Sequence, residues 1–98
     1  MKIEIIKNDT TLEVNLEGRL DTVTAPELEA ALAGQTDAAE KLVLDLLKLE
    51  YVSSAGLRIL LKLHKEFSAK QGMTVKNVNE IVREVFDITG FSDILNIG

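Results

Sequence analysis

Residues 41–57 read KLVLDLLKLEYVSSAGL, an apolar run that passes through a polar segment into two serines and a glycine. The run Lys41–Leu47 is almost continuously apolar, which predicts a central strand covered on both faces. Asp45 interrupts this run, and we expect its carboxylate to find donors or to reach the loop that follows, because burying it unpaired is costly. From Gly56 apolar residues recur every three or four positions, which indicates a helix that ends before Gly72.

The segments before this strand predict a hairpin and a helix. Lys2–Lys7 and Thr11–Leu16 are rich in β-forming residues and are separated by a short polar turn, so we expect an antiparallel hairpin. Thr24 lies three residues before Glu27, which is the spacing of a capping box. A first helix is therefore expected from this point to about Gly34.

The segments after the strand predict one more strand and one more helix. Met73–Val78 is β-like, and either Asn77 or Asn79 can cap a third helix that stops at Gly90. The tail Phe91–Ile97 closes as a short strand or helix. The residues expected to point inward from the third helix are Ile81, Val82, Val85 and Phe86. The order β, β, α, β, α, β, α predicts an α/β fold, with a mixed β-sheet, an N-terminal antiparallel hairpin and helices layered on the sheet.

Length and charge restrict the classes of function. The 98 residues fit a single domain, residues 1–98. The formal net charge of −5 argues against nucleic-acid binding. The absence of cysteine excludes disulfides and thiolate metal sites. The first residues lack the apolar core of a signal peptide and no run approaches a membrane span, so we expect a cytoplasmic protein with no membrane contact.

Motifs for catalysis are missing from the sequence. It has no GxxxxGK, GxGxxG, HExxH or GxSxG. The single histidine, His64, falls at a helical position near the expected core and is predicted to be a packed side chain. An acid–base pair of Asp21 and Asp45 would lack a nucleophile and base at a known spacing. We therefore expect no enzymatic activity, no cofactor and no metal.

The two serines at the start of the second helix have two interpretations. In one, Ser53 or Ser54 is an N-cap whose hydroxyl accepts a hydrogen bond from an amide of the first turn, worth about 1 kcal/mol. In the other, the free amides and the helix dipole favour an anion there, so a phosphate on one serine is tolerated by the fold. Such a phosphate would add about −1.5 to −2 charges, enough to repel a docked partner.

Three segments resemble one family. Leu44-Asp45-Leu46 followed by Tyr51-Val52-Ser53-Ser54-Ala55-Gly56-Leu57-Arg58 looks like the phosphorylation-loop motif of STAS-domain anti-sigma factor antagonists, within the sulfate transporter and anti-sigma antagonist family. Gly18-Arg19-Leu20-Asp21 is similar to that family's Gly-Glu-Leu-Asp turn, and Val85-Phe86-Asp87-Ile88-Thr89-Gly90-Phe91 to its last-helix segment. The resemblance covers nearly the whole chain and implies a STAS-like fold.

The resemblance also implies a regulatory cycle. The unphosphorylated antagonist binds an anti-sigma factor that is also a serine kinase, and so releases a sigma factor. Phosphorylation by the kinase ends this binding, and a PP2C-type phosphatase restores it. The acceptor serine of the family falls on Ser54, while Ser53 stands where the family often has Asp and remains a rival acceptor. The alternative is a STAS module that docks within a lipid-transport or stress-signalling complex without a phosphorylation cycle.

Further residues near this loop are candidates for partner binding. Asp21 matches a loop Asp of the family that lies beside the acceptor, and its other interpretation is a turn-stabilising Asx residue. Ala55 and Gly56 belong to the loop motif itself. Tyr51 and Leu57 are either apolar anchors for a partner or core side chains.

A row of cations follows on the second helix. Arg58, Lys62 and Lys65 lie three and four residues apart, which places them on one face for an acidic kinase surface. The other interpretation is an ordinary solvated face on which Glu66 pairs with Lys62 and Lys70.

Overall fold

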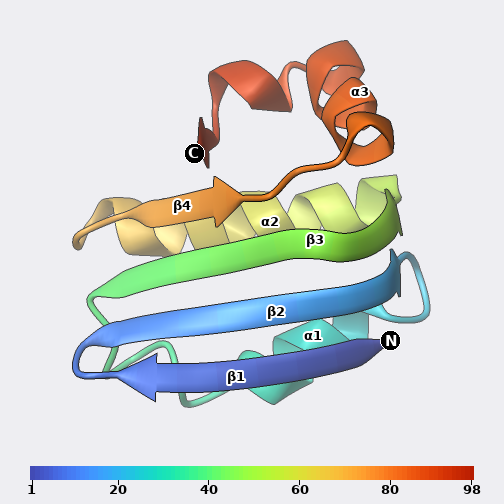
Figure 1. Cartoon of the computed structure of the whole chain (residues 1–98). Coiled ribbons are helices and arrows are strands. Elements are labelled where there is room, and N and C mark those ends of the chain that lie inside the picture. The colour runs from blue at the N-terminus through green and yellow to red at the C-terminus, as the bar shows by residue number, and fades with distance from the viewer.

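The computed structural model describes residues 1–98 and contains one five-stranded sheet in the order β1-β2-β3-β4-β5 (Figure 1). The strands are β1 (Lys2–Asn8), β2 (Thr11–Leu20), β3 (Lys41–Val52), β4 (Met73–Lys76) and β5 (Asn96–Ile97). β1 and β2 form the antiparallel hairpin, and every other neighbouring pair is parallel. The predicted mixed α/β architecture is confirmed.

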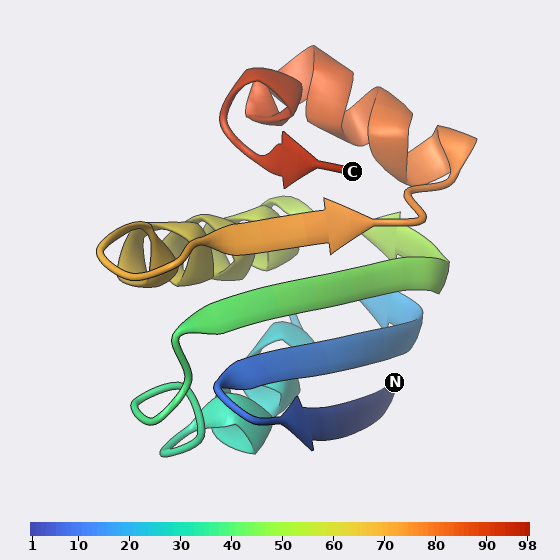
Figure 2. The same cartoon turned by 60° about the vertical axis from the view of Figure 1, so that its left-hand side comes forward.

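Three helices pack against this sheet. They are α1 (Ala25–Leu32), α2 (Ser54–Ser68) and α3 (Glu80–Thr89), and a short 3₁₀ helix at Phe91–Asp93 leads into β5. α1 and α2 lie together on one face of the sheet, whereas α3 lies beyond β4 at the C-terminal edge (Figures 1 and 2). The tail is therefore both a helical turn and a strand.

β3 is covered on one face only, so the predicted burial of both faces is wrong. Leu42, Leu44 and Leu46 are fully buried beneath the helices, while the side chains between them point to an uncovered face. Asp45 lies on that uncovered face, where its Oδ1 accepts hydrogen bonds from the Leu47 amide at 3.0 Å and the Asn77 side chain at 3.1 Å. It does not reach the loop after β3.

β3 also runs five residues beyond its predicted end at Leu47, to Val52. Its pairing with β2 slips twice, between Asn15 and Glu17 and again between Gly18 and Arg19. Each slip inserts one extra residue in β3, as a β-bulge does. The buried positions Leu46, Leu49 and Val52 are consequently three residues apart. Because these positions do not alternate, the sequence pattern does not show that the strand continues to Val52.

β2 likewise continues to Leu20, although the sequence predicted an end at Leu16. The predicted turn at Gly18–Asp21 therefore begins only at Asp21. β4 ends at Lys76 and not at Val78. Of the two candidate caps of α3, Asn79 is the one used, because its Oδ1 accepts from the Val82 amide at 2.9 Å.

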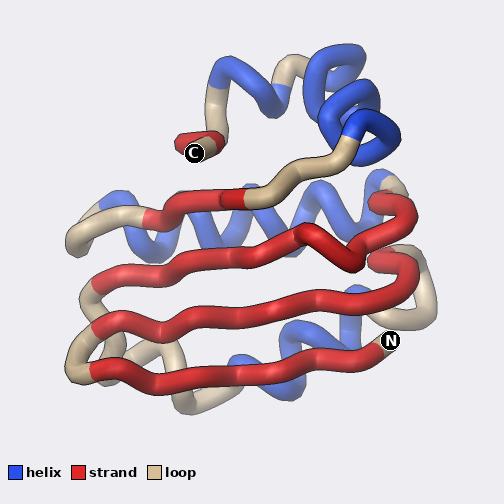
Figure 3. Tube along the Cα trace, in the orientation of Figure 1, coloured by secondary structure: helices blue, strands red, loops and turns tan.

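Parallel pairing brings three loops to one edge of the sheet. β2, β3 and β4 all run toward the right-hand side of Figures 1 and 3, where α1, α2 and α3 begin; β2 and β3 end there, and the shorter β4 is continued to that side by residues 77–79. In sheets of this kind, the carboxyl ends of parallel strands are the usual place for ligand and partner sites. Residues 21–24 and 53–56, which are distant in sequence, are neighbours here.

Candidate functional site

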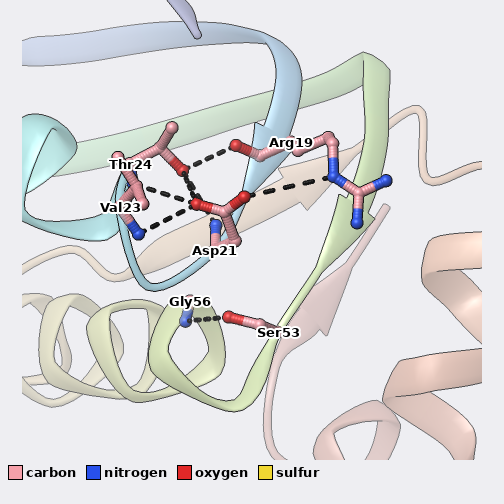
Figure 4. Close-up of polar contacts among 6 residues, drawn as sticks. All are labelled: Arg19, Asp21, Val23, Thr24, Ser53 and Gly56. Atoms are coloured by element: carbon pink, nitrogen blue, oxygen red, sulfur yellow. Dashed lines mark hydrogen bonds and ion pairs between the residues drawn. The ribbon is translucent and has the colours of Figure 1, made fainter.

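Ser53 is the N-cap of α2. Its amide donates to the Leu20 carbonyl at 2.8 Å, which ties the end of β3 to β2. Its Oγ accepts from the Gly56 amide at 3.3 Å, and its carbonyl accepts the first helical bond from Leu57 at 2.8 Å (Figure 4). The N-cap interpretation is therefore confirmed for Ser53, whose hydroxyl is half-buried and engaged.

Ser54 has a different environment, although it is the next residue. It is the first residue of α2, its side chain is exposed, and its hydroxyl makes no hydrogen bond. The amides of Ser54 and Ala55 precede the first bond within the helix, which Leu57 makes. Such amides, with the positive end of the helix dipole, favour an anion. The Ser54 hydroxyl is accessible and lies where a phosphate would be stabilised.

Gly56 is required by the close approach of α2 to the sheet. A Cβ at this position would lie 2.8 Å from three atoms: Cγ and the carbonyl oxygen of Leu20, and Cγ2 of Val52. Real Cβ atoms essentially never approach neighbours so closely. The glycine thus lets the first turn of α2 rest directly on the ends of β2 and β3, and this contact fixes where Ser53 and Ser54 lie.

Asp21 organises the adjacent loop. Its Oδ1 accepts from the amides of Val23 and Thr24, both at 3.0 Å, and its carbonyl accepts from Ala25 at 2.8 Å (Figure 4). The hydrogen bond from the Thr24 amide is the main cause of a lowered pKa for the Asp21 carboxyl, with smaller contributions from Val23 and Arg19. Asp21 is the turn-stabilising residue that one interpretation proposed, and it stays ionised.

The capping box predicted at Thr24 is absent. Thr24 has helical backbone angles and its side chain caps no helical amide. Its hydroxyl instead accepts from the Asp21 amide at 2.8 Å and donates to the Arg19 carbonyl at 2.6 Å. The acceptor for the amides of this turn is Asp21, which precedes it and binds the amides of Val23 and Thr24. The spacing of Thr24 and Glu27 carries no information about this acceptor.

Two further residues lie at this edge and were not among the predicted site residues, Arg19 and Val23. The Arg19 guanidinium carbon lies 4.7 Å from the centre of the Tyr51 ring, a cation–π contact, and its Nε lies 4.0 Å from Asp21 Oδ2. Val23 points outward with 75% of its surface exposed. An apolar residue inside a polar turn, as Val23 is, could have indicated an exposed contact residue. The contact of Arg19 with Tyr51 could not be predicted, because it depends on the bulged pairing of β2 and β3.

Other predicted partner-binding residues are buried in the core or already form contacts within the molecule. Leu57 is buried in the core and offers no apolar anchor. Lys62 pairs with Glu29 of α1 and not with Glu66, and this bond raises the pKa of Lys62. Lys70 donates to backbone carbonyls after α1, including that of Thr36 at 2.7 Å. The predicted pairing of Glu66 with Lys62 and Lys70 is thus wrong.

Of the remaining predicted residues, Tyr51, Ala55 and Arg58 lie near the start of α2, and Lys65 lies in its last turn. Arg58 and Lys65 are exposed and form no ion pair, Tyr51 is partly exposed, and Ala55 is half-buried. His64 is half-buried on α2. Side chains that could hold a metal ion are not grouped anywhere in the molecule. None of the helices is long and apolar enough to cross a membrane.

Comparison with known proteins gives the same architecture and a family. The STAS domain family model matches residues 2–98. A Bordetella bronchiseptica protein, BtrV, which carries the name of an anti-sigma factor antagonist, is 41% identical over 99% of this chain and 85% of its own length.

Two solved structures share the fold. The crystal structure of an anti-sigma factor antagonist from Mycobacterium paratuberculosis matches with a TM-score of 0.87 and 28% identity, over 98% of this chain and 83% of that chain. The Bacillus cell fate determinant SpoIIAA, solved in its phosphorylated form, matches with a TM-score of 0.75 and 19% identity, over 99% and 91% of the two chains. With the family model and the Bordetella relative, these matches lead to one conclusion: the chain belongs to the STAS domain family.

Proposed function

We propose that this chain is an anti-sigma factor antagonist that binds its partner through the start of α2 and is released when Ser54 is phosphorylated. The observation that carries the proposal is the contrast between two adjacent hydroxyls. Ser53 uses its oxygen to cap α2, whereas Ser54 is exposed and unbonded at the same helix end. The relatives named as anti-sigma factor antagonists support the same function.

The physical basis of the switch is a change of charge on a rigid surface. A phosphate on Ser54 brings about −1.5 to −2 charges. The free amides at the start of α2 stabilise it, so the fold itself survives the modification. A partner that packs closely over the small Ser54 hydroxyl would instead meet a bulky anion. The nearby Asp21 carboxylate, whose pKa lies below its ordinary value, adds negative charge to the same edge.

The partner that this chemistry fits is an anti-sigma factor that is also a serine kinase. It would dock on the edge formed by Asp21, Tyr51 and the start of α2, with Arg58 exposed beside the acceptor. A PP2C-type phosphatase would restore the unphosphorylated form. The chain then acts by binding rather than by catalysis, and the cycle takes place in the cytoplasm without metal or cofactor in the chain itself.

Phosphorylation by the cognate kinase tests the acceptor. The purified chain is incubated with the anti-sigma factor kinase of its own organism and ATP, and the modified residue is located by mass spectrometry. We expect one phosphate on Ser54, none on the Ser54→Ala variant, and a Ser53→Ala variant that is still modified. A Ser54→Ala variant phosphorylated as fully as the wild type would disprove the assignment.

Calorimetry with the same kinase tests the switch. Ser54→Ala should bind with or without ATP, because no phosphate can form. Ser54→Asp should bind at least about tenfold more weakly, since a fixed negative charge replaces the hydroxyl under the docked partner. Equal affinities for the wild type, Ser54→Ala and Ser54→Asp would show that Ser54 lies outside the interface.

A further inference from the structure

The outer surface of α3 carries apolar side chains that no other element covers. Ile81 is 60% exposed and Ile88 is 78% exposed, the largest exposed fraction among the exposed large hydrophobic residues. Val85 lies between them and is half-buried. Positions 81, 85 and 88 are four and three residues apart, so they form one row along the helix. The sequence predicted Ile81 inside the core, but the core row is the adjacent one, with Val82 and Phe86.

A row of acids runs beside this apolar row. Glu80, Glu84 and Asp87 have the same spacing, displaced by one position, and all three are exposed. None of them takes part in an ion pair, although Asp87 accepts a hydrogen bond from Ser92. The one cation of α3, Arg83, lies on the side of the acids away from the apolar row, by the geometry of the helix. The apolar row is therefore bordered by the core on one side and by negative charge on the other.

We propose that these two rows form a docking surface for a protein segment that presents apolar side chains bordered by Lys or Arg. The α3 surface is defined by Glu80, Ile81, Glu84, Val85, Asp87 and Ile88. Apolar side chains inserted against Ile81 and Ile88 would be removed from water, and cations beside them would meet the free acids. Exposed apolar groups with a polar border are typical of interaction sites.

The charges favour such a partner over a second copy of this chain. Antiparallel pairing of α3 with α3 of another copy would set the acidic row against itself, and each chain carries a net charge of −5. The α3 surface also contains neither Ser54 nor any group that holds the start of α2. Binding here would therefore be independent of phosphorylation and goes beyond the switch proposed above.

NMR titration of the full chain with designed peptides tests the proposal. One peptide is an amphipathic helix with leucines spaced four and three residues apart and a flanking row of lysines, and the matched peptide has glutamates in place of the lysines. The lysine peptide should shift amide signals within residues 80–89. The glutamate peptide should bind at least about tenfold more weakly, because its charges repel the acidic row.

Variants separate specific docking from general attraction to an acidic protein. Ile88→Ser should lower the affinity for the lysine peptide at least about tenfold. The double variant Glu84→Gln, Asp87→Asn should lower it about fivefold. Val23→Ser is the matched control, because it removes an equally exposed apolar side chain at the other site. It should bind like the wild type, and so should Ser54→Asp. Spectra of the free variants verify that each is folded.

Three outcomes would overturn the proposal. Signals that shift mainly outside residues 80–89 would place the peptide elsewhere. Equal affinity for the two peptides would remove the role of charge. Shifts of residues 80–89 that depend on protein concentration without peptide would assign the α3 surface to a second copy. Each of these outcomes leaves the role of Ser54 unaffected, because that role is measured with the kinase.

Discussion

The first turns of α1 and α2 lie at the same edge of the sheet, but their side chains use the edge differently. Before α1, Asp21 accepts from two backbone amides and the Thr24 hydroxyl both accepts and donates, so the polar side chains of Asp21 and Thr24 are engaged. At α2, Ser53 satisfies one amide and Ser54 satisfies none. The turn before α1 is therefore held by several hydrogen bonds, whereas the start of α2 combines one capping bond with a free hydroxyl.

The difference shows how one edge can be both stable and modifiable. The groups that hold the two turns together are Asp21, Ser53 and Gly56, and Ser54 contributes to none of these contacts. The proposed phosphate on Ser54 would therefore leave these contacts in place. Substitutions at the four positions should separate effects on the free energy of unfolding from effects on phosphorylation.

The largest expected loss of stability comes from Gly56→Ala. The added methyl would meet the Leu20 backbone oxygen, which no rotamer change can move away. Overpacking of this kind costs about 1–3 kcal/mol, and it outweighs the gain of up to about 1 kcal/mol in helix propensity. Thermal unfolding followed by circular dichroism measures the loss. An unchanged melting temperature would mean that α2 lies further from β2 and β3 than described.

Asp21→Ala should rank next. It removes the acceptor of the Val23 and Thr24 amides and so loosens the turn before α1. We expect a smaller loss than for Gly56→Ala and a larger one than for Ser53→Ala, because two amides lose their acceptor instead of one. Urea unfolding at neutral pH orders the three variants, and an Asp21→Ala variant as stable as the wild type would show that the turn does not depend on the carboxylate.

The pH dependence at Asp21 follows from its lowered pKa. The folded-state pKa lies below the ordinary value of 3.8, so its contribution is present above that value and is lost as the pH falls through the folded-state pKa. Asp21→Asn keeps an acceptor oxygen but has no charge to titrate. Acid titrations should therefore show a smaller decrease in stability for Asp21→Asn than for the wild type below about pH 4. Parallel curves would contradict the lowered pKa.

Ser53→Ala should have a smaller effect. It removes one capping bond, and at 3.3 Å that bond is long. A loss of about 0.5–1 kcal/mol is expected, at the low end for N-cap substitutions. Ser53→Asp, which restores an acceptor, is the control and should recover the stability. A loss above about 2 kcal/mol would indicate that Ser53 does more than cap the helix.

Ser54→Ala should have the smallest effect on stability, within about 0.5 kcal/mol of the wild type, as for other exposed positions without contacts. The same variant should abolish phosphorylation. It should therefore combine the smallest effect on stability with the largest effect on phosphorylation. A clearly destabilised Ser54→Ala protein would mean that its hydroxyl has a structural bond and is not free.

The sequence predicted the parts of the fold that depend on local patterns. The hairpin of β1 and β2, the start of α2 at the two serines and the αL stop of α3 at Gly90 are all present. Predictions failed where distant contacts decide. Two bulges extend β3 to Val52, and the face opposite α1 and α2 has no cover, which leaves Asp45 in contact with Asn77. The prediction that Ile81 points inward is wrong, because hydrophobic periodicity identifies the apolar face of α3 but not how far the core extends across it.

Local patterns predict the order of the elements and the pair of serines where a buried strand meets a helix, because capping chemistry and hydrophobic periodicity act over a few neighbouring residues. Contacts between distant segments determine which serine is free and what lies beside it. Ser53 is engaged because its amide reaches Leu20 of another strand and its oxygen reaches Gly56. That geometry depends on parallel pairing of segments far apart in the chain, which no local pattern encodes.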